Sequence, residues 1–312
     1  MPKIYYNTNA SKEGDGGLTE AIFTMPFESQ EFFKEDSFEN NRFGEIIGKG
    51  KSIIEFTSIE KCDYVIIPYK WVGYDSLTNS LIKEAKKYNK KVIALFNDDS
   101  HPSQILKEED GYMFLTTFNK SSKLPNQIAF PAFCGDFYTQ YSSTPIKTNQ
   151  HTVGFCGAIT HQIRGVTLNS LNSSSILKPN FIIRQGFWAP EIPNRMVARE
   201  QYMKNLRDNC FNVCMRGAGN FSYRLYETMM MGRIPIIINS DQVFPFGDIL
   251  NYEEFSIIIN FDDVSSIEKL IGDWLSTKTP QDLVDIQNKN RDIWLTYMSP
   301  QGWLNNFTKE MQ

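Results

Sequence analysis

One short stretch, from Phe211 to Asp241, constrains the fold of this 312-residue chain more than any other. It reads as an apolar β-prone segment at 211–215, a glycine-containing loop, a segment with apolar residues at helical spacing, and a second apolar run at 233–238. A strand that leads through a loop into a helix and then into another strand is the repeating unit of parallel α/β sheets. The pattern therefore predicts an α/β domain with this unit at its centre.

The loop that follows the first of these strands, from Arg216 to Asn220, has the composition of an anion-binding site. Gly217 and Gly219 let a ligand approach the backbone N–H groups closely, and Asn220 is a candidate N-cap of the next helix. The first turn of a helix carries unpaired N–H donors and the positive end of the helix dipole. We expect the N–H groups between Gly217 and Ser222 to face an anion.

Charged side chains beside this loop extend the prediction. Arg216 and Arg224 each offer a planar guanidinium, which binds phosphate oxygens in pairs, while Arg233 lies at the far end of the helix. Glu227 follows Arg224 by three residues, so both point from the same helix face. An arginine for a phosphate and a carboxylate for ribose hydroxyls together describe a nucleotide site. An intrahelical Arg–Glu pair on a solvated face is the alternative, and the spacing leaves both interpretations open.

Length and composition suit two domains with full hydrophobic cores. The net charge of −4 gives no general attraction to nucleic acid or to membranes. Five cysteines without a CxxC pair are typical of buried thiols in a reducing compartment. The N-terminal residues lack the apolar core of a signal peptide, and no run reaches the roughly 18 apolar residues of a membrane span. We expect a cytoplasmic protein without a transmembrane segment, and a peripheral place at the cytoplasmic face of a membrane is compatible with this.

The first half of the chain predicts strands that alternate with helical segments. The expected strands are 3–7, 63–68, 91–96, 111–117 and 127–130, with a helix at 76–88 that Asp75 caps. In a parallel sheet the loops after the strands meet at the carboxyl edge, where ligands bind. The carboxylates in two such loops are therefore candidates for contact with a substrate. They are Asp15 and Glu20 after the first strand, and Asp98 and Asp99, followed by His101, after the third.

The second half repeats this organisation after a polar linker at 138–149. The predicted strands are 153–156, 180–185, 211–215, 233–238 and 255–261, and the predicted helices are 195–209, 264–275 and 281–298. Two parallel doubly wound sheets are expected, one in each half. Arg164 follows a tight turn of small residues after the strand at 153–156, which is a second strand–turn–helix unit.

The run RGAGNFSYRLYETMMMGRIPIII, followed by Pro245-Phe246 and by Phe255-Ser256-Ile257, resembles the signature of exostosin-like glycosyltransferases of GT47 type. That family has an arginine–glycine loop, an S-Y-R-x-Y-E helix start, a G-x-I-P-I-I-I strand and a P-F turn. The densest match covers 216–259, and looser similarity reaches back to 153–157 and 126–131.

The resemblance implies a GT-B fold, in which two Rossmann-like doubly wound domains face a central cleft. The N-terminal acceptor-side domain would span 1–145 and the nucleotide-sugar-binding domain 146–290, with the final helix, 291–312, packing back on the first domain. The implied activity is metal-independent transfer, with inversion, of a sugar from a nucleotide-sugar, expected to be UDP-linked, to a glycan or lipid-linked glycan. No nucleic-acid partner is expected, and the oligomeric state is not predicted. Because no anchor segment is expected, we expect the chain to depart in this respect from eukaryotic exostosins, which are membrane proteins.

The resemblance also implies which residues act. The donor would be bound by Arg164, Arg216, Gly217, Gly219, Asn220, Ser222, Tyr223, Arg224 and Glu227. No metal is expected, since Asp98-Asp99 and Asp262-Asp263 do not form a DxD motif, so the arginines would meet the charge of the leaving group. The base that deprotonates the acceptor hydroxyl is sought among the carboxylates Asp98, Asp99, Asp15 and Glu20, with His101 as a further candidate, and nothing in the spacing selects one.

Two other functions fit part of the pattern. The sequence G-x-G-x-x-S from Gly217 to Ser222, with Asp241 ending the next strand, is similar to the fingerprint of NAD-dependent oxidoreductases. Ser222 in place of the third glycine, and the extra charge of Arg216 and Arg224, argue against that function. A non-catalytic nucleotide- or sugar-binding protein of the same fold is the other alternative, because the base is unidentified.

Overall fold

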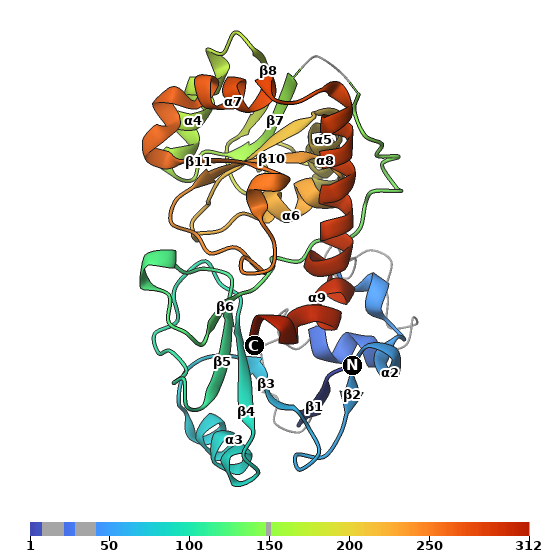
Figure 1. The fold of residues 1–312 in the computed structure, drawn as a ribbon, viewed down its shortest axis with the longest axis vertical. Helices are drawn as coiled ribbons and strands as arrows, with labels where there is room; N and C mark the ends of the chain where they lie inside the picture. The colour runs from blue at the N-terminus through green and yellow to red at the C-terminus, as the bar shows by residue number, and fades with distance from the viewer. Residues whose placement is uncertain (8–21, 29–41, 148–150, 312) are drawn as a thin grey trace. The chain divides into compact units, whose positions relative to one another are not determined.

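The computed structural model describes residues 1–7, 22–28, 42–147 and 151–311. The chain divides into two compact units, each with a parallel sheet of its own (Figure 1). Unit 1 consists of Met1–Gly135, Val243–Asp248 and Thr296–Gln312, and unit 2 of Asp136–Gln242 and Ile249–Leu295. Asp15 and Glu20 lie outside the described residues.

Unit 1 contains a six-stranded sheet in the order β2-β1-β3-β4-β5-β6, and its strand pairs are parallel. The strands are β1 (Lys3–Tyr6), β2 (Glu55–Phe56), β3 (Tyr64–Lys70), β4 (Lys91–Phe96), β5 (Gly111–Leu115) and β6 (Gln127–Ala129). Helix α3 (Ser76–Lys87) contacts β3 and β4, and the Asp75 side chain caps it by accepting from the Thr78 N–H, as predicted. The expected strands of this half are confirmed.

The core of unit 1 includes a cluster of aromatic rings around Trp303 on α9 (Pro300–Asn306). The Trp303 ring stacks on Phe307 at 4.8 Å and meets the edges of three phenylalanines that precede or follow the strands. Those three are Phe23, Phe130 and Phe133. Because Trp303 is fully buried, α9 contributes to the centre of this unit.

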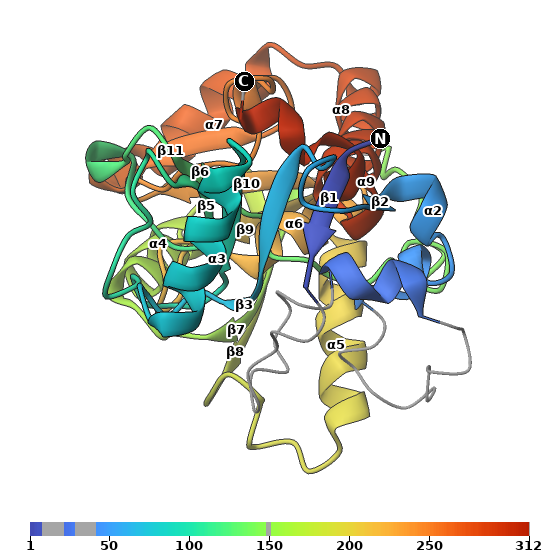
Figure 2. The ribbon, with the colours of Figure 1, turned by 90° about the horizontal axis from the view of Figure 1, so that it is seen from below.

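Unit 2 contains a five-stranded parallel sheet in the order β11-β10-β9-β7-β8. Its strands are β7 (His151–Ala158), β8 (Leu177–Arg184), β9 (Phe211–Cys214), β10 (Ile234–Asn239) and β11 (Ile257–Asn260). Its α-helices are α4 (Gln162–Asn172), α5 (Arg195–Asp208), α6 (Tyr223–Met230), α7 (Ile267–Ser276) and α8 (Pro280–Ile293). Helix α5 contacts β7, and Figure 2 shows this helix from the side. The predicted α/β class, with a parallel sheet in each half of the chain, is confirmed.

Helix α6 differs from the prediction at its start. It begins at Tyr223 with Ser222 as the N-cap residue, and Asn220 does not cap it. Instead, the Asn220 side chain exchanges two hydrogen bonds with Ser240 at the end of β10, at 3.0 and 2.7 Å. The predicted stop is confirmed, because Gly232 follows the helix with a φ of +61°, in the left-handed region that favours glycine.

In the part of the chain that the structure describes, no helix combines the length and the apolar character needed to cross a membrane.

Candidate functional site

The strand order of unit 2 identifies the place where a ligand would bind. From β7 the chain passes through α4 to β8 on one side, while β9 and the strands after it lie on the other side of β7. The carboxyl ends of β7 and β9 therefore flank the topological switch point, where open α/β sheets bind their ligands. Arg164, Arg216 and Arg224 follow these two strands in the sequence, and the structure brings them together.

Arg224 is buried at this point, with a side chain only 7% exposed. Its guanidinium carbon lies 4.2 Å from the centre of the Phe155 ring on β7, and its Nη2 donates to the carbonyl of Cys156. A Cβ at Gly157 would come within 2.9 Å of the same Nη2, so this glycine makes room for the arginine. The Nε–H of Arg224 is buried and has no hydrogen-bond partner among the described residues. One donor of a rigidly held cation is thus left unused.

Arg164 comes from the first turn of α4 and lies 5.8 Å from the same Phe155 ring. It donates from Nε to the Arg216 carbonyl at 2.9 Å and from Nη1 to the Ala158 carbonyl at 2.8 Å. Burial and the neighbouring charge of Arg224 lower the pKa of Arg164 to about 10, so it remains a cation at neutral pH. Arg216 bonds through Nη2 to the carbonyl of Ala218, and its Nε–H is also buried without a partner.

These three guanidinium groups carry positive charge that no carboxylate among the described residues neutralises. Among the described residues, none of the ion pairs includes Arg164, Arg216 or Arg224. Two of the three are largely buried, and a buried cation without a counter-charge is costly in free energy. Such a cluster favours the binding of an anion with several oxygens, because that anion supplies the missing negative charge.

Glu227 does not form the intrahelical ion pair with Arg224 that was the alternative to a nucleotide site. Its Oε2 accepts a hydrogen bond from the hydroxyl of Tyr202 on α5. The Tyr202 ring centre lies 5.7 Å from the Arg224 guanidinium carbon. Burial and the Glu227 carboxylate raise the pKa of Tyr202 well above 10, so the phenol stays protonated and keeps donating.

The glycine loop is arranged differently from a dinucleotide fingerprint. Neither Gly217 nor Gly219 is among the residues with a positive φ. A Cβ at Gly217 would lie 3.2 Å from Nη2 of Arg164, so side-chain packing rather than backbone conformation favours glycine there. Its N–H donates to the Phe221 carbonyl at 3.4 Å and is occupied. At the helix start, the Ser222 side chain makes no capping bond, and the Tyr223 ring packs on Phe221.

The two aromatic residues that hold Arg224 in place, Phe155 and Tyr202, were not predicted as site residues. Phe155 lies in the segment 153–157 of looser family similarity, and that similarity was the one available signal. Tyr202 is one of several aromatic residues in the chain, and its contact with Glu227 depends on how α5 packs on the sheet. His161, beside the same cluster, caps α4 by accepting from the Ile163 N–H at 3.2 Å. Burial and the charges of Arg216 and Arg164 lower its pKa, which keeps it neutral.

The carboxylate candidates of unit 1 occupy different environments. Asp98 forms an ion pair with Lys70 at 2.5 Å and accepts from both the N–H and the hydroxyl of Ser100 at 2.9 Å. The hydrogen bonds from Lys70 and Ser100 lower its pKa to about 2, which makes its carboxylate a weak base. Asp99 and His101 are exposed. Asp98 therefore has the contacts of a residue that stabilises the loop after β4.

We expect Asp98→Asn to reduce the stability of the protein modestly and to leave any transferase activity within a few-fold of the parent. The pKa of Asp98 is lower in the folded chain than its ordinary 3.8, so its stabilising contribution is present above pH 4 and lost as pH falls toward 2. At this partly exposed site the contribution is roughly 0.5–1 kcal/mol. Urea unfolding of parent and variant at pH 7 and pH 2.5 measures it. A loss of activity of a hundredfold or more would instead identify Asp98 as the base.

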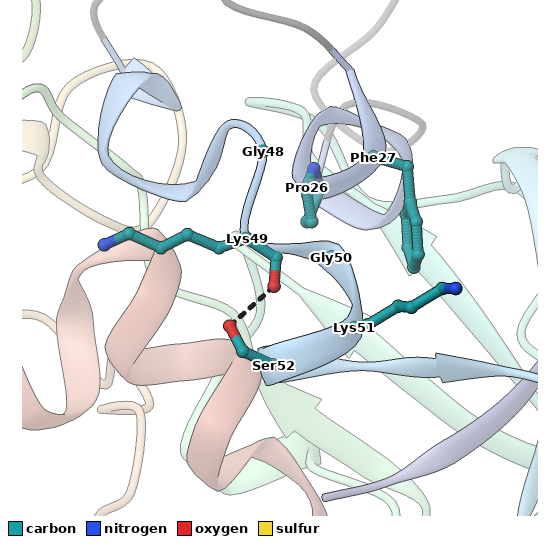
Figure 3. A pocket seen from close by; sticks show the side chains of 7 residues that line it. All are labelled: Pro26, Phe27, Gly48, Lys49, Gly50, Lys51 and Ser52. Carbon is teal, nitrogen blue, oxygen red and sulfur yellow. Dashed lines mark hydrogen bonds between the residues drawn. The ribbon is translucent and has the colours of Figure 1, made fainter.

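A separate groove of about 410 Å³ lies on unit 1 and is lined by Pro26, Phe27, Gly48, Lys49, Gly50, Lys51 and Ser52 (Figure 3). Its polar groups are mostly occupied. Lys49 Nζ donates to Gln301 at 2.6 Å, and the Ser52 hydroxyl donates to the Lys49 carbonyl at 2.7 Å, the bond drawn in Figure 3. Helix α2 (Gly50–Ile53) has only four residues. The groove lacks the converging donors of an anion site.

The described residues contain no cluster of three or more His, Cys, Asp or Glu side chains arranged to hold a metal ion. The switch point of unit 2 therefore presents a cationic site made of arginines and backbone. Together with the strand order, this defines an α/β domain with a cationic site at its topological switch point.

Comparison with known proteins tests the resemblance found in the sequence. Residues 155–273 match the model of the Exostosin GT47 domain, which confirms the resemblance of this part of unit 2 to exostosin-like glycosyltransferases. A probable glycosyltransferase of Arabidopsis thaliana is 33% identical over 70 residues, which are 22% of this chain and 14% of that protein. A probable glucuronosyltransferase of Oryza sativa subsp. japonica is 30% identical over 83 residues, 27% of this chain and 19% of that protein. The matched part of the chain thus spans less than a fifth of these curated relatives.

Solved structures are similar over most of the chain at low identity. A glycosyltransferase of Rickettsia africae has a TM-score of 0.48 and 12% identity, with 98% of this chain and 96% of that chain covered. The Anabaena HepE protein, solved with UDP, has a TM-score of 0.45 and 8% identity, with 100% and 99% covered.

Proposed function

We propose that this chain is an inverting, metal-independent glycosyltransferase that moves a sugar from a UDP-linked donor to a hydroxyl of a glycan or lipid-linked glycan. One observation carries the proposal. In the segment that matches the exostosin GT47 domain, three arginines converge on the switch point of the sheet, and none of them has a carboxylate partner in the described part of the chain. A nucleoside diphosphate is an anion with several oxygens that fits such a cluster.

The arrangement would act mainly on the leaving group. When the bond between the sugar and the diphosphate breaks, negative charge grows on the diphosphate oxygens. Arg224 and Arg164 are fixed in advance by Phe155 and by backbone carbonyls, so they stabilise this charge without having to reorganise. Glu227 would accept hydrogen bonds from the ribose hydroxyls. Inversion requires a base on the opposite side of the sugar.

The candidate bases differ in how well they fit this role. Asp98 is the weakest of them, because its pKa is about 2 and Lys70 is bound to it. Asp99, Asp15 and Glu20 remain the candidates for deprotonating the acceptor hydroxyl. Alanine or amide variants of these three, assayed side by side, are the direct way to choose among them.

A thermal-shift and activity series tests the function. At one hundred times its dissociation constant, UDP should stabilise the protein by about 2.7 kcal/mol, a rise in Tm of several degrees, whereas NAD should have no effect. UDP should then be released from a UDP-sugar when an acceptor is present, at a rate that EDTA does not change. Equal stabilisation by NAD would favour the oxidoreductase, and UDP binding without turnover of any donor would favour a binding protein. Loss of activity in EDTA that Mg²⁺ or Mn²⁺ restores would refute the metal-independent mechanism.

A further inference from the structure

Tyr202 occupies a position between the two residues of α6 that the proposed donor site needs. Its hydroxyl donates to Oε2 of Glu227, and its ring lies 5.7 Å from the guanidinium carbon of Arg224. It comes from α5, which contacts β7, the strand that carries Phe155. Arg224 thus lies close to the rings of Phe155 and Tyr202. Tyr202 also binds Glu227, which lies on the same helix as Arg224.

Arg224 and Glu227 would be expected to pair with each other. Side chains three residues apart on a helix are neighbours, and opposite charges at this spacing attract. Yet no nitrogen of Arg224 lies within 4.0 Å of an oxygen of Glu227. The carboxylate is bound to Tyr202, while the guanidinium bonds to the carbonyl of Cys156 and retains one unpartnered N–H. A neutral phenol therefore takes the place that a charged partner would otherwise occupy.

We propose that Tyr202 is a positioning residue of the donor site, which binds Glu227 and thereby keeps its carboxylate away from Arg224. The guanidinium then stays available for the diphosphate, and the carboxylate stays available for the ribose. This inference rests on the proposed function, since it assigns a task within the same site.

Removal of the hydroxyl by Tyr202→Phe tests the inference. Without the phenol, Glu227 pairs with Arg224 and competes with the ligand, so the dissociation constants of both UDP and inorganic pyrophosphate should rise about tenfold. Adding Glu227→Gln to this variant removes the competing charge and should return pyrophosphate affinity to within about threefold of the parent. Glu227→Gln alone should weaken UDP, through the ribose, and leave pyrophosphate unchanged. A purely structural role for Tyr202 predicts no such recovery in the double variant.

Tyr141→Phe is the matched control, because it removes a tyrosine hydroxyl that donates at 2.9 Å to Glu200, a carboxylate of α5 that is not assigned to the donor site. It should bind both ligands as the parent does. Isothermal calorimetry of the five proteins gives the affinities. The inference is overturned, while the proposed function stands, if Tyr202→Phe binds pyrophosphate like the parent. The same holds if adding Glu227→Gln to Tyr202→Phe does not restore the affinity for pyrophosphate. If the parent binds neither UDP nor pyrophosphate, the proposed function fails and the inference fails with it.

Discussion

Changing Arg224 to methionine is expected to weaken UDP binding by about 1.5–3 kcal/mol, the contribution of a charge-assisted hydrogen bond. Methionine keeps most of the apolar stem but has no charge. Because Arg224 is buried and has no carboxylate partner, its replacement by an apolar side chain should leave the ligand-free protein as stable as the parent or more stable. Loss of UDP affinity without loss of protein stability would show that the Arg224 cation serves ligand binding rather than folding.

Calorimetric titration with UDP, beside thermal unfolding without ligand, measures both effects for Arg224→Met. Arg195→Met is the matched control, since Arg195 is exposed at the start of α5 and should change neither. Arg233 provides the opposite case. It is buried, but its guanidinium is bound to the carbonyls of Arg207, Met231 and Gly232, so replacing it should cost stability. Unchanged UDP affinity in Arg224→Met would place the donor elsewhere.

Changing Trp303 to alanine is expected to destabilise unit 1 by about 3–5 kcal/mol, the usual cost of removing a large buried aromatic side chain. The side chain is fully buried and contacts several other rings, with Phe307 stacked on it at 4.8 Å and Phe130 at 5.0 Å. The neighbouring rings come from well-separated parts of the chain, so the cavity cannot be filled by a local adjustment. Denaturant unfolding followed by circular dichroism measures the loss.

Two further variants make the Trp303 result specific. Trp303→Phe keeps an aromatic ring and should lose clearly less than the alanine variant. Trp188→Ala removes a tryptophan that is 62% exposed, and its effect should stay within about 0.5 kcal/mol. An alanine variant at Trp303 that unfolds at the same denaturant concentration as the parent would show that α9 is not part of the core of unit 1.

The sequence predicted the strands well because their apolar runs are buried on both faces of parallel sheets, as at 63–68 and 233–238. It was less accurate at the start of α6, which begins at Tyr223 rather than directly after Asn220. An asparagine before an apolar run satisfies the local rule for an N-cap. Here its side chain bonds to Ser240, twenty residues further along the chain, and this tertiary contact overrides the local preference.

The site was predictable only in part, for a similar reason. The arginines could be found because they lie within or beside a glycine loop at the end of a strand. Their environment could not, because Phe155 and Tyr202 reach Arg224 from other elements, and only the packing of α5 and β7 brings them together. The same holds for Asp98. Its place after a strand was correctly predicted, but its ion pair with Lys70 depends on the register of two neighbouring strands.

The composition of unit 1 from three separate stretches of chain has a consequence for biosynthesis. Residues 1–135 leave the ribosome first, yet the hydrophobic centre that they surround lacks Trp303 and Phe307 until 296–311 have been made. Unit 2 ends at Leu295 and can finish folding earlier. The half that is translated first is therefore completed last, and during that interval its unfilled apolar interior is the surface that a chaperone would recognise.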